Sequence, residues 1–388
     1  MKLAGFSTFR SWGPIATTIV ITLGCAYSAW CESPPVPAKT FAGKYAMFDG
    51  DIPLWVDQGY IDRALTRLKA AGFNVYMPTV WQGRGTAWPS KYAPWDIQLK
   101  DREKTDFDPL RYAITKAHEL GMEVHPWFTL TLRQSDLFPE FALSGAPFDA
   151  FDVHNPEFRR LMTNLVTEVV EVYDVDGINL DYVRAVGLCS SASCAEQYRQ
   201  QYGRILSVDS AIFTMTFGKA TPLAEFQETA VTDLVRSIVE AARSRKPALF
   251  ISVDAIPLQS GPEQGQASVR WTNEGLINAI LRMDYFPKIN VNVTDAVRAQ
   301  LSNPNALTLL ICNMATEEEL TTPTQPRFPR SGDWLAGTVS MVQSRWPNTG
   351  MAVYFYKYFT DEQGVALRNG PFRKRVDSPK APVGLKAQ

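Results

Sequence analysis

The stretch VDGINLDYVR, residues 175–184, begins like a buried strand and ends with a carboxylate, Asp181, and a guanidinium, Arg184. A short apolar run of this kind, with amphipathic segments before and after it, is typical of a strand in a parallel α/β sheet. In parallel barrels the carboxyl ends of the strands carry the functional side chains. The stretch therefore predicts a buried parallel strand with a functional acid at its end.

The same alternation of apolar run and amphipathic helix continues along the chain. Strands are predicted at 44–50, 74–81, 122–130, 176–183, 248–256, 283–290, 306–314 and 350–358. Helices are predicted between them at 61–72, 108–121, 155–173, 223–245, 273–282, 293–302 and 332–345. Strands that alternate with helices imply right-handed βαβ units, and eight such units over roughly 320 residues fit one closed barrel. The predicted fold is a (β/α)8 TIM barrel of the α/β class.

The N-terminus has the features of a secretory signal. Lys2 and Arg10 precede an apolar segment at 15–24 that is too short to span a bilayer. We predict a signal peptide at 1–30, a Pro-rich linker at 31–43, the barrel at 44–373 and a flexible tail at 374–388. The mature chain is then exported to the periplasm or the outside of the cell without a membrane span. Lipoprotein anchoring at Cys25 stays open as an alternative.

The composition restricts the partners. The formal net charge of the 388-residue chain is −1, which argues against nucleic acid as a partner. No metal site is predicted, because the three histidines are not at i, i+4 spacing and no CxxC pair occurs. No cofactor is predicted either, since no GxGxxG or P-loop pattern follows the first strand. Export favours a disulfide between Cys189 and Cys194, which lie in one Ser-rich loop.

Polar and aromatic residues recur at the predicted strand ends. Sugars need many hydrogen-bonding partners for their hydroxyl groups, and the C–H faces of their rings stack on aromatic planes. We therefore predict a polysaccharide or oligosaccharide as the bound partner. The predicted substrate-binding residues are Trp81, Arg84, Trp88, His125, Trp127, Arg184, Asn290 and Tyr356. The three indoles are expected to line one groove, with His125 beside Asp181.

Paired carboxylates remain the best-placed catalytic groups. Glycoside cleavage needs one carboxylic acid that protonates the leaving oxygen and one carboxylate that attacks the sugar or activates water. Asp181 and Asp254 lie on neighbouring predicted strands, and we predict them as the catalytic pair, with Asp254 as the acid. Asp49 or Asp51 is the alternative partner, and so is the acidic run at 317–319, which is more typical of a solvated loop. A salt bridge from Asp181 to Arg184 is the structural alternative to catalysis.

Two segments carry a family resemblance. AHELGMEVHPW (117–127) and DGINLDYVR (176–184) resemble the motifs of the glycosyl hydrolase-like 10 family. The chain departs from the family pattern at Asn179, where the family often has His. The resemblance implies a TIM barrel and hydrolysis of a polysaccharide, either an exopolysaccharide or a cell-wall glycan. The alternative is a non-catalytic carbohydrate-binding barrel in an envelope or polysaccharide-export assembly.

Overall fold

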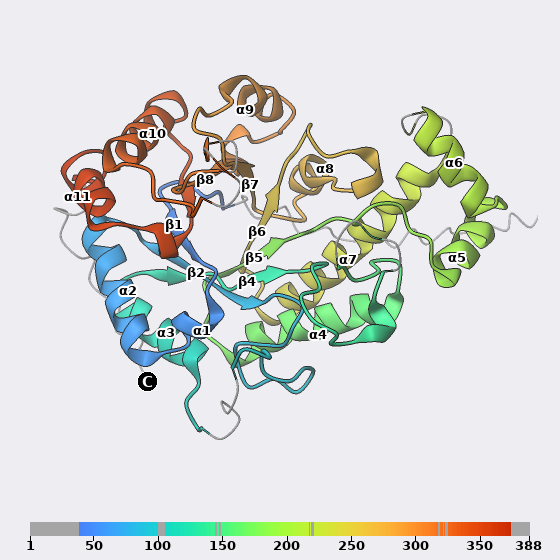
Figure 1. Ribbon diagram of the computed structural model, residues 1–388, viewed down its shortest axis with the longest axis horizontal. Helices are drawn as coiled ribbons and strands as arrows, with labels where there is room; N and C mark the ends of the chain where they lie inside the picture. The colour runs from blue at the N-terminus through green and yellow to red at the C-terminus, as the bar shows by residue number, and fades with distance from the viewer. Residues whose placement is uncertain are drawn as a thin grey trace, which may run out of the picture. The chain divides into compact units, whose positions relative to one another are not determined.

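A closed parallel barrel forms the structured part of the chain (Figure 1). The computed structural model describes residues 39–373 except 100–104, 144–145, 147–148, 217, 219–220, 317–318, 321 and 323–324. The predicted signal peptide, Cys25, most of the predicted linker and the predicted tail lie outside the described residues. The described residues belong to one compact unit, Ala38–Gln388.

The strands close the barrel through β1, which pairs in parallel with both β2 and β9. The strands are β1 (Tyr45–Asp49), β2 (Val75–Trp81), β3 (Glu123–Val124), β4 (Trp127–Thr129), β5 (Gly177–Asp181), β6 (Phe250–Ala255), β7 (Ala279–Asp284), β8 (Leu307–Cys312) and β9 (Met351–Tyr354). Both β3 and β4 pair with β2, on either side of Pro126, so they fill one position of the barrel. The predicted (β/α)8 barrel is confirmed.

Helices follow the strands and flank the outside of the barrel (Figure 1). They are α1 (Ile52–Trp55), α2 (Gln58–Ala71), α3 (Pro109–Glu119), α4 (Pro156–Val172), α5 (Ala192–Tyr202), α6 (Leu206–Thr216), α7 (Leu223–Arg245), α8 (Ser268–Asn273), α9 (Val291–Arg298), α10 (Gly332–Arg345) and α11 (Asp361–Asn369). The side chains of Asp57, Asp108 and Asn155 cap α2, α3 and α4 by accepting hydrogen bonds from first-turn amides. No helix of the described residues has the length and apolar content needed to cross a membrane.

The two-residue alternation of the strands creates two cores. In β1, Tyr45 and Met47 belong to the large cluster between the strands and the helices. Ala46 and Phe48 belong to a second cluster inside the barrel. Successive side chains of a strand point to opposite faces, so a strand such as β1 contributes to both cores.

The barrel begins before the predicted boundary at residue 44. Phe41 lies within the predicted linker, yet its side chain is fully buried in the inner cluster. Its ring contacts the rings of His125 and Phe250, with centroid distances of 6.5 and 5.9 Å. The last residues of the predicted linker therefore help to close the amino-terminal end of the barrel.

The strand predicted at 283–290 begins earlier in the structure, where it is β7. Residues 273–282 were expected to form a helix, but α8 ends at Asn273 and Gly275 adopts a left-handed φ of 73°. The following apolar run enters β7 at Ala279. A run that is buried on both faces has no periodicity that separates a strand from a helix.

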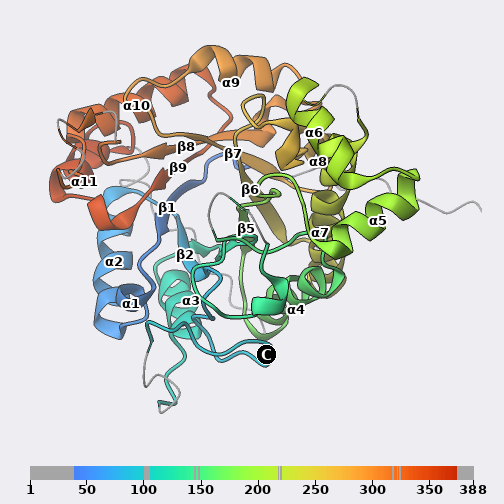
Figure 2. The ribbon, with the colours of Figure 1, turned by 45° about the vertical axis from the view of Figure 1, so that its right-hand side comes forward.

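The connection from β5 to α7 contains two helices that the sequence analysis did not predict, α5 and α6. Figure 2 shows them beside the barrel, outside the helices that flank it. The predicted disulfide is confirmed: Cys189 and Cys194 are bonded, with their Cα atoms 6.2 Å apart. The bond ties the loop after β5 to the first turn of α5.

Replacement of Phe41 by Ala tests its place in the barrel. We expect Phe41→Ala to lower the free energy of unfolding by about 3–5 kcal/mol, because a fully buried aromatic side chain leaves a cavity. Urea unfolding followed by tryptophan fluorescence measures this change. The matched control is Phe328→Ala, because this ring is 43% exposed, and its loss should cost less than about 1 kcal/mol. Equal effects of the two substitutions would show that Phe41 belongs to a linker.

Candidate active site

A cavity of about 630 Å³ opens at the carboxyl end of the strands. This volume suits a ligand of several rings. Its lining comes from most strands of the barrel and from the loops that follow them. The polar lining residues are Gln82, Thr129, Gln134, Asp181, Arg184, Asp254, Gln259, Cys312, Thr316 and Arg327. The aromatic ones are Phe48, Trp127, Tyr182, Tyr285, Phe286 and Tyr354.

Asp181 is held by donors on both of its oxygens. The backbone N–H of Tyr182 donates to Oδ1 at 2.6 Å, and the indole N–H of Trp127 donates to Oδ2 at 3.3 Å. Tyr182 has a left-handed φ of 49°, which turns the chain sharply at the end of β5. Burial raises the pKa of Asp181 to about 6, while the two donors and the charge of Arg184 oppose the rise.

Asp254 has a different environment. Its carboxyl is 1% exposed, and it accepts a hydrogen bond at 2.9 Å from the side-chain amide of Asn179. The same amide nitrogen donates to the hydroxyl of Ser252 at 3.0 Å. Burial, and then the negative charge of Asp181, raise the pKa of Asp254 well above its usual value. Asp254 therefore keeps its proton at a pH where Asp181 is ionised.

The two carboxyl groups lie on adjacent strands and face one cavity. The β5–β6 register pairs Leu180 with Val253, so Asp181 and Asp254 each come one residue after this pair. Asn179 and Asp181 share the inner face of β5 because they are two residues apart. This arrangement places a protonated acid beside a carboxylate, which is the chemistry of general acid–base catalysis.

Aromatic rings form part of the cavity wall. Tyr285 and Tyr354 stack with ring centroids 5.6 Å apart, and Tyr354 meets Trp127 edge-on at 6.2 Å. Phe48 also packs edge-on against Trp127, with ring centroids 5.1 Å apart. Among these, only Trp127 was predicted to bind substrate. The two-residue alternation could have identified the other rings. Each lies close to the carboxyl end of its strand, at a position where the side chain points into the barrel.

Two of the three predicted indoles do not line the cavity. Trp81 and Trp88 are fully buried in the cluster between the barrel and the helices. Trp88 donates its indole N–H to Glu168 of α4 at 3.0 Å. The register of β2 against β4 shifts between Thr79 and Trp81, and such a bulge turns the next side chain to the opposite face. The prediction of one groove with three indoles is wrong.

His125 does not lie beside Asp181. It is fully buried, and its Nε2 forms a hydrogen bond of 3.0 Å with Glu123. A Cβ atom at Gly177, the first residue of β5, would lie 2.9 Å from the His125 ring. His125 therefore occupies the lower part of the barrel interior, two residues below Trp127, and does not line the cavity.

Three other predicted binding residues are also absent from the cavity lining. Arg84 pairs with Asp96 at 2.7 Å. Asn290 caps α9 by accepting a hydrogen bond from the amide of Val293. Tyr356 lies in a short 3-10 helix, Tyr356–Tyr358, and packs against Tyr60. Of the predicted substrate-binding set, the structure brings Trp127 and Arg184 to the two acids.

Asp49, the alternative catalytic residue, faces the helices. Its carboxylate accepts hydrogen bonds from the hydroxyl groups of Tyr76 at 2.9 Å and Tyr60 at 3.4 Å. Burial raises its pKa to about 7. Because Asp49 does not line the cavity, this shift reflects a buried structural contact. Asp51 pairs with Lys357 and also lies outside the cavity lining.

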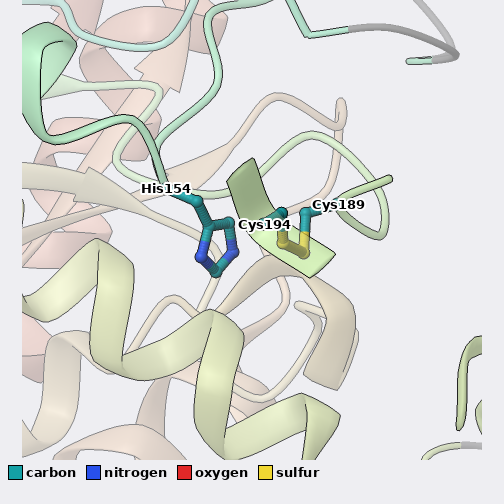
Figure 3. A group of neighbouring side chains, drawn as sticks. All are labelled: His154, Cys189 and Cys194. Atoms are coloured by element: carbon teal, nitrogen blue, oxygen red, sulfur yellow. A yellow bond between two sulfur atoms is a disulfide. The ribbon is translucent and has the colours of Figure 1, made fainter. Parts of the chain in front are cut away.

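One group of described residues has metal-ligand chemistry. The side chains of His154, Cys189 and Cys194 come together beside α5 (Figure 3). The two sulfur atoms are joined in the disulfide, and His154 forms a hydrogen bond of 2.6 Å with Gln227. A disulfide offers no thiolate to a metal, so in this state the group stabilises the loop after β5.

Solved structures with the same fold include several glycosidases. The model matches alpha-L-fucosidase isoenzyme 2 from Paenibacillus thiaminolyticus with a TM-score of 0.61 and 14% identity, over 87% of this chain and 49% of that chain. It matches the glycoside hydrolase domain of PgaB (BpsB) from Bordetella bronchiseptica with a TM-score of 0.59 and 11% identity, over 87% and 99%. These likenesses concern the fold.

Sequence comparison leads to the family. The chain is 25% identical over 274 residues to the glycosyl hydrolase DigH of Escherichia coli K12, and this match covers 59% of this chain. The match spans 58% of the length of that relative. The family model described as glycosyl hydrolase-like 10 matches residues 49–149 and 143–312, which include both acids of the cavity. The chain therefore belongs to the glycosyl hydrolase-like 10 family.

Proposed function

We propose that this protein is an exported glycoside hydrolase that cleaves a polysaccharide, either an exopolysaccharide or a cell-wall glycan. The observation that carries the proposal is the pair Asp181 and Asp254. Both acids face one cavity, and the surroundings favour the ionised form of Asp181 and the protonated form of Asp254. The family membership and the glycosidase fold support the reaction class. Export rests on the apolar segment at 15–24 and the basic residues before it.

The two acids divide the reaction between them. Asp254 gives its proton to the glycosidic oxygen, and the bond from that oxygen to the anomeric carbon breaks. Asp181 either attacks the anomeric carbon or takes a proton from the water that attacks it. The backbone N–H of Tyr182 and the indole of Trp127 hold the Asp181 carboxylate in place. The side-chain amide of Asn179 donates a hydrogen bond to Oδ1 of Asp254, so it holds this carboxyl group without accepting its proton.

The cavity wall provides the binding surface. The stacked rings of Tyr285 and Tyr354 present a flat apolar face to a pyranose ring. Arg184 and Gln259 add hydrogen-bond donors at the same opening. This combination of rings and polar groups suits a sugar chain better than an apolar ligand.

Replacement of each acid by its amide tests the pair. We expect Asp181→Asn and Asp254→Asn to lower kcat by about 100-fold or more on a panel of bacterial exopolysaccharides and cell-wall glycans, because each removes a proton-transfer or nucleophilic group. Reducing-end release measures the rate. The control Asp49→Asn alters a buried carboxyl outside the cavity and should keep activity within about threefold.

A different result favours the alternative function. If the wild-type protein cleaves no glycan of the panel but binds one, and both amide variants bind it equally well, the barrel is a carbohydrate-binding module. Circular dichroism of each variant separates loss of catalysis from loss of folding.

The pH dependence of activity tests the role of Asp181. Because Asp181 must be ionised, kcat/KM should rise with pH through a midpoint at about 6. The charge of Arg184 favours the ionised form, so Arg184→Gln should raise the pKa of Asp181 and move this midpoint to higher pH. The measurement is kcat/KM on one cleaved glycan between pH 4 and pH 9, a range of about five units around the expected midpoint. A midpoint that stays in place in the variant contradicts the assignment.

A further inference from the structure

The helix α6 carries an exposed apolar stripe. Ile205, just before the helix, is 65% exposed, Val208 is 51% exposed and Met215 is 80% exposed. Ile212 lies between them and is half-buried. Large apolar side chains with this exposure, gathered on one short helix, mark a surface that contacts another molecule.

The spacing of the four residues gives the stripe its geometry. Steps of three, four and three residues place Ile205, Val208, Ile212 and Met215 along one side of the helix, at the a and d positions of two heptads. The neighbouring side of α6 is already occupied. Leu206 and Phe213 are buried there with the disulfide and the side chains of α5 and α7. The stripe is therefore a second apolar face, in addition to the face that packs within the chain.

The charges on α6 restrict the partner. The helix contains no Lys, Arg or Glu. Its one acid, Asp209, is buried and binds Arg204 at 2.7 Å and the hydroxyl of Tyr198 at 2.7 Å. A helix that docks on an anionic membrane carries Lys and Arg beside its apolar side, and α6 has none. Two copies of an uncharged stripe meet without repulsion between like charges.

We propose that the α6 stripe is a self-association surface, on which the same stripe of a second copy of this chain packs about a twofold axis. An a/d seam is complementary to itself, as an isologous contact requires. The seam is short, since α6 has 11 residues and extends about 16 Å. Such a small contact gives a weak dimer, with a dissociation constant on the order of micromolar.

The position of the stripe links the dimer to the cavity. The connection that contains α6 begins directly after Asp181, and its first residues Tyr182 and Arg184 line the cavity. The disulfide joins this loop to α5. Contact between two α6 helices would restrain the same connection that supplies Arg184. The proposal does not depend on the glycosidase reaction, because its test measures mass.

Sedimentation equilibrium of the chain from Ala38 onward, which forms one compact unit, tests the proposal. We expect the wild-type chain to dimerise reversibly, and Val208→Asp with Met215→Asp to weaken dimerisation at least about tenfold, because two charges from each copy would be buried without partners. The matched control is Leu54→Asp with Val365→Asp, which adds the same charge at side chains that are 46% and 43% exposed. This control should dimerise like the wild type.

Three outcomes overturn the proposal. The first is a wild-type chain that stays monomeric up to about 100 µM, well above the expected dissociation constant. The second is a dimer that the α6 pair and the control pair weaken equally. The third is a monomer that binds neutral phosphatidylcholine vesicles through Val208 and Met215, since the stripe would then contact lipid. Circular dichroism and the melting temperature of each variant show whether the fold is retained.

Discussion

The two-residue alternation of a closed parallel barrel is the constraint on which this structure depends. Each strand sends every second side chain into an interior of fixed width, so the interior is filled in layers. Phe41, His125 and Phe250 fill the lower part, and Phe48 and Leu281 belong to the same inner cluster. Because apolar packing closes the interior below, the cavity opens at the carboxyl ends of the strands alone. The site is a consequence of where the packing stops.

Two buried acids in the upper layer would be costly if both were charged. The barrel reduces this cost because the two acids have different surroundings. Asp181 receives a backbone donor, an indole donor and a nearby guanidinium, which stabilise its ionised form. Burial, and then the negative charge of Asp181, keep Asp254 protonated, although the amide donor of Asn179 opposes this. The separation of the two pKa values is therefore built into the wall of the barrel, before any substrate binds.

The sequence alone predicted the barrel and the position of Asp181 and Asp254 at the ends of neighbouring strands, because both depend on alternation and on strand ends. The catalytic role of the two acids stays a prediction. The prediction of a groove with three indoles was wrong. The register shift between Thr79 and Trp81 turns the Trp81 side chain outward, and no residue type in the sequence indicates this shift. The helix expected at 273–282 failed, because a fully buried strand has no apolar period. His125 was expected beside Asp181 but lies nearer the amino-terminal end of the barrel, because a predicted strand end does not show which interior layer a side chain occupies. The hydrogen bond from Asn179 to Asp254 could not be predicted, because it depends on the register of β5 against β6.

Asn179 shows how one inner side chain can define the chemistry of the acid beside it. An imidazole at this position would change its own charge between pH 5 and pH 8, and so would alter the field at Asp254. The amide of Asn179 has no charge to lose, and it can give Asp254 Oδ1 only an N–H. The proton of Asp254 is then restricted to Oδ2. In this chain the protonation of the acid depends on burial and on Asp181, and not on the titration of a neighbouring base.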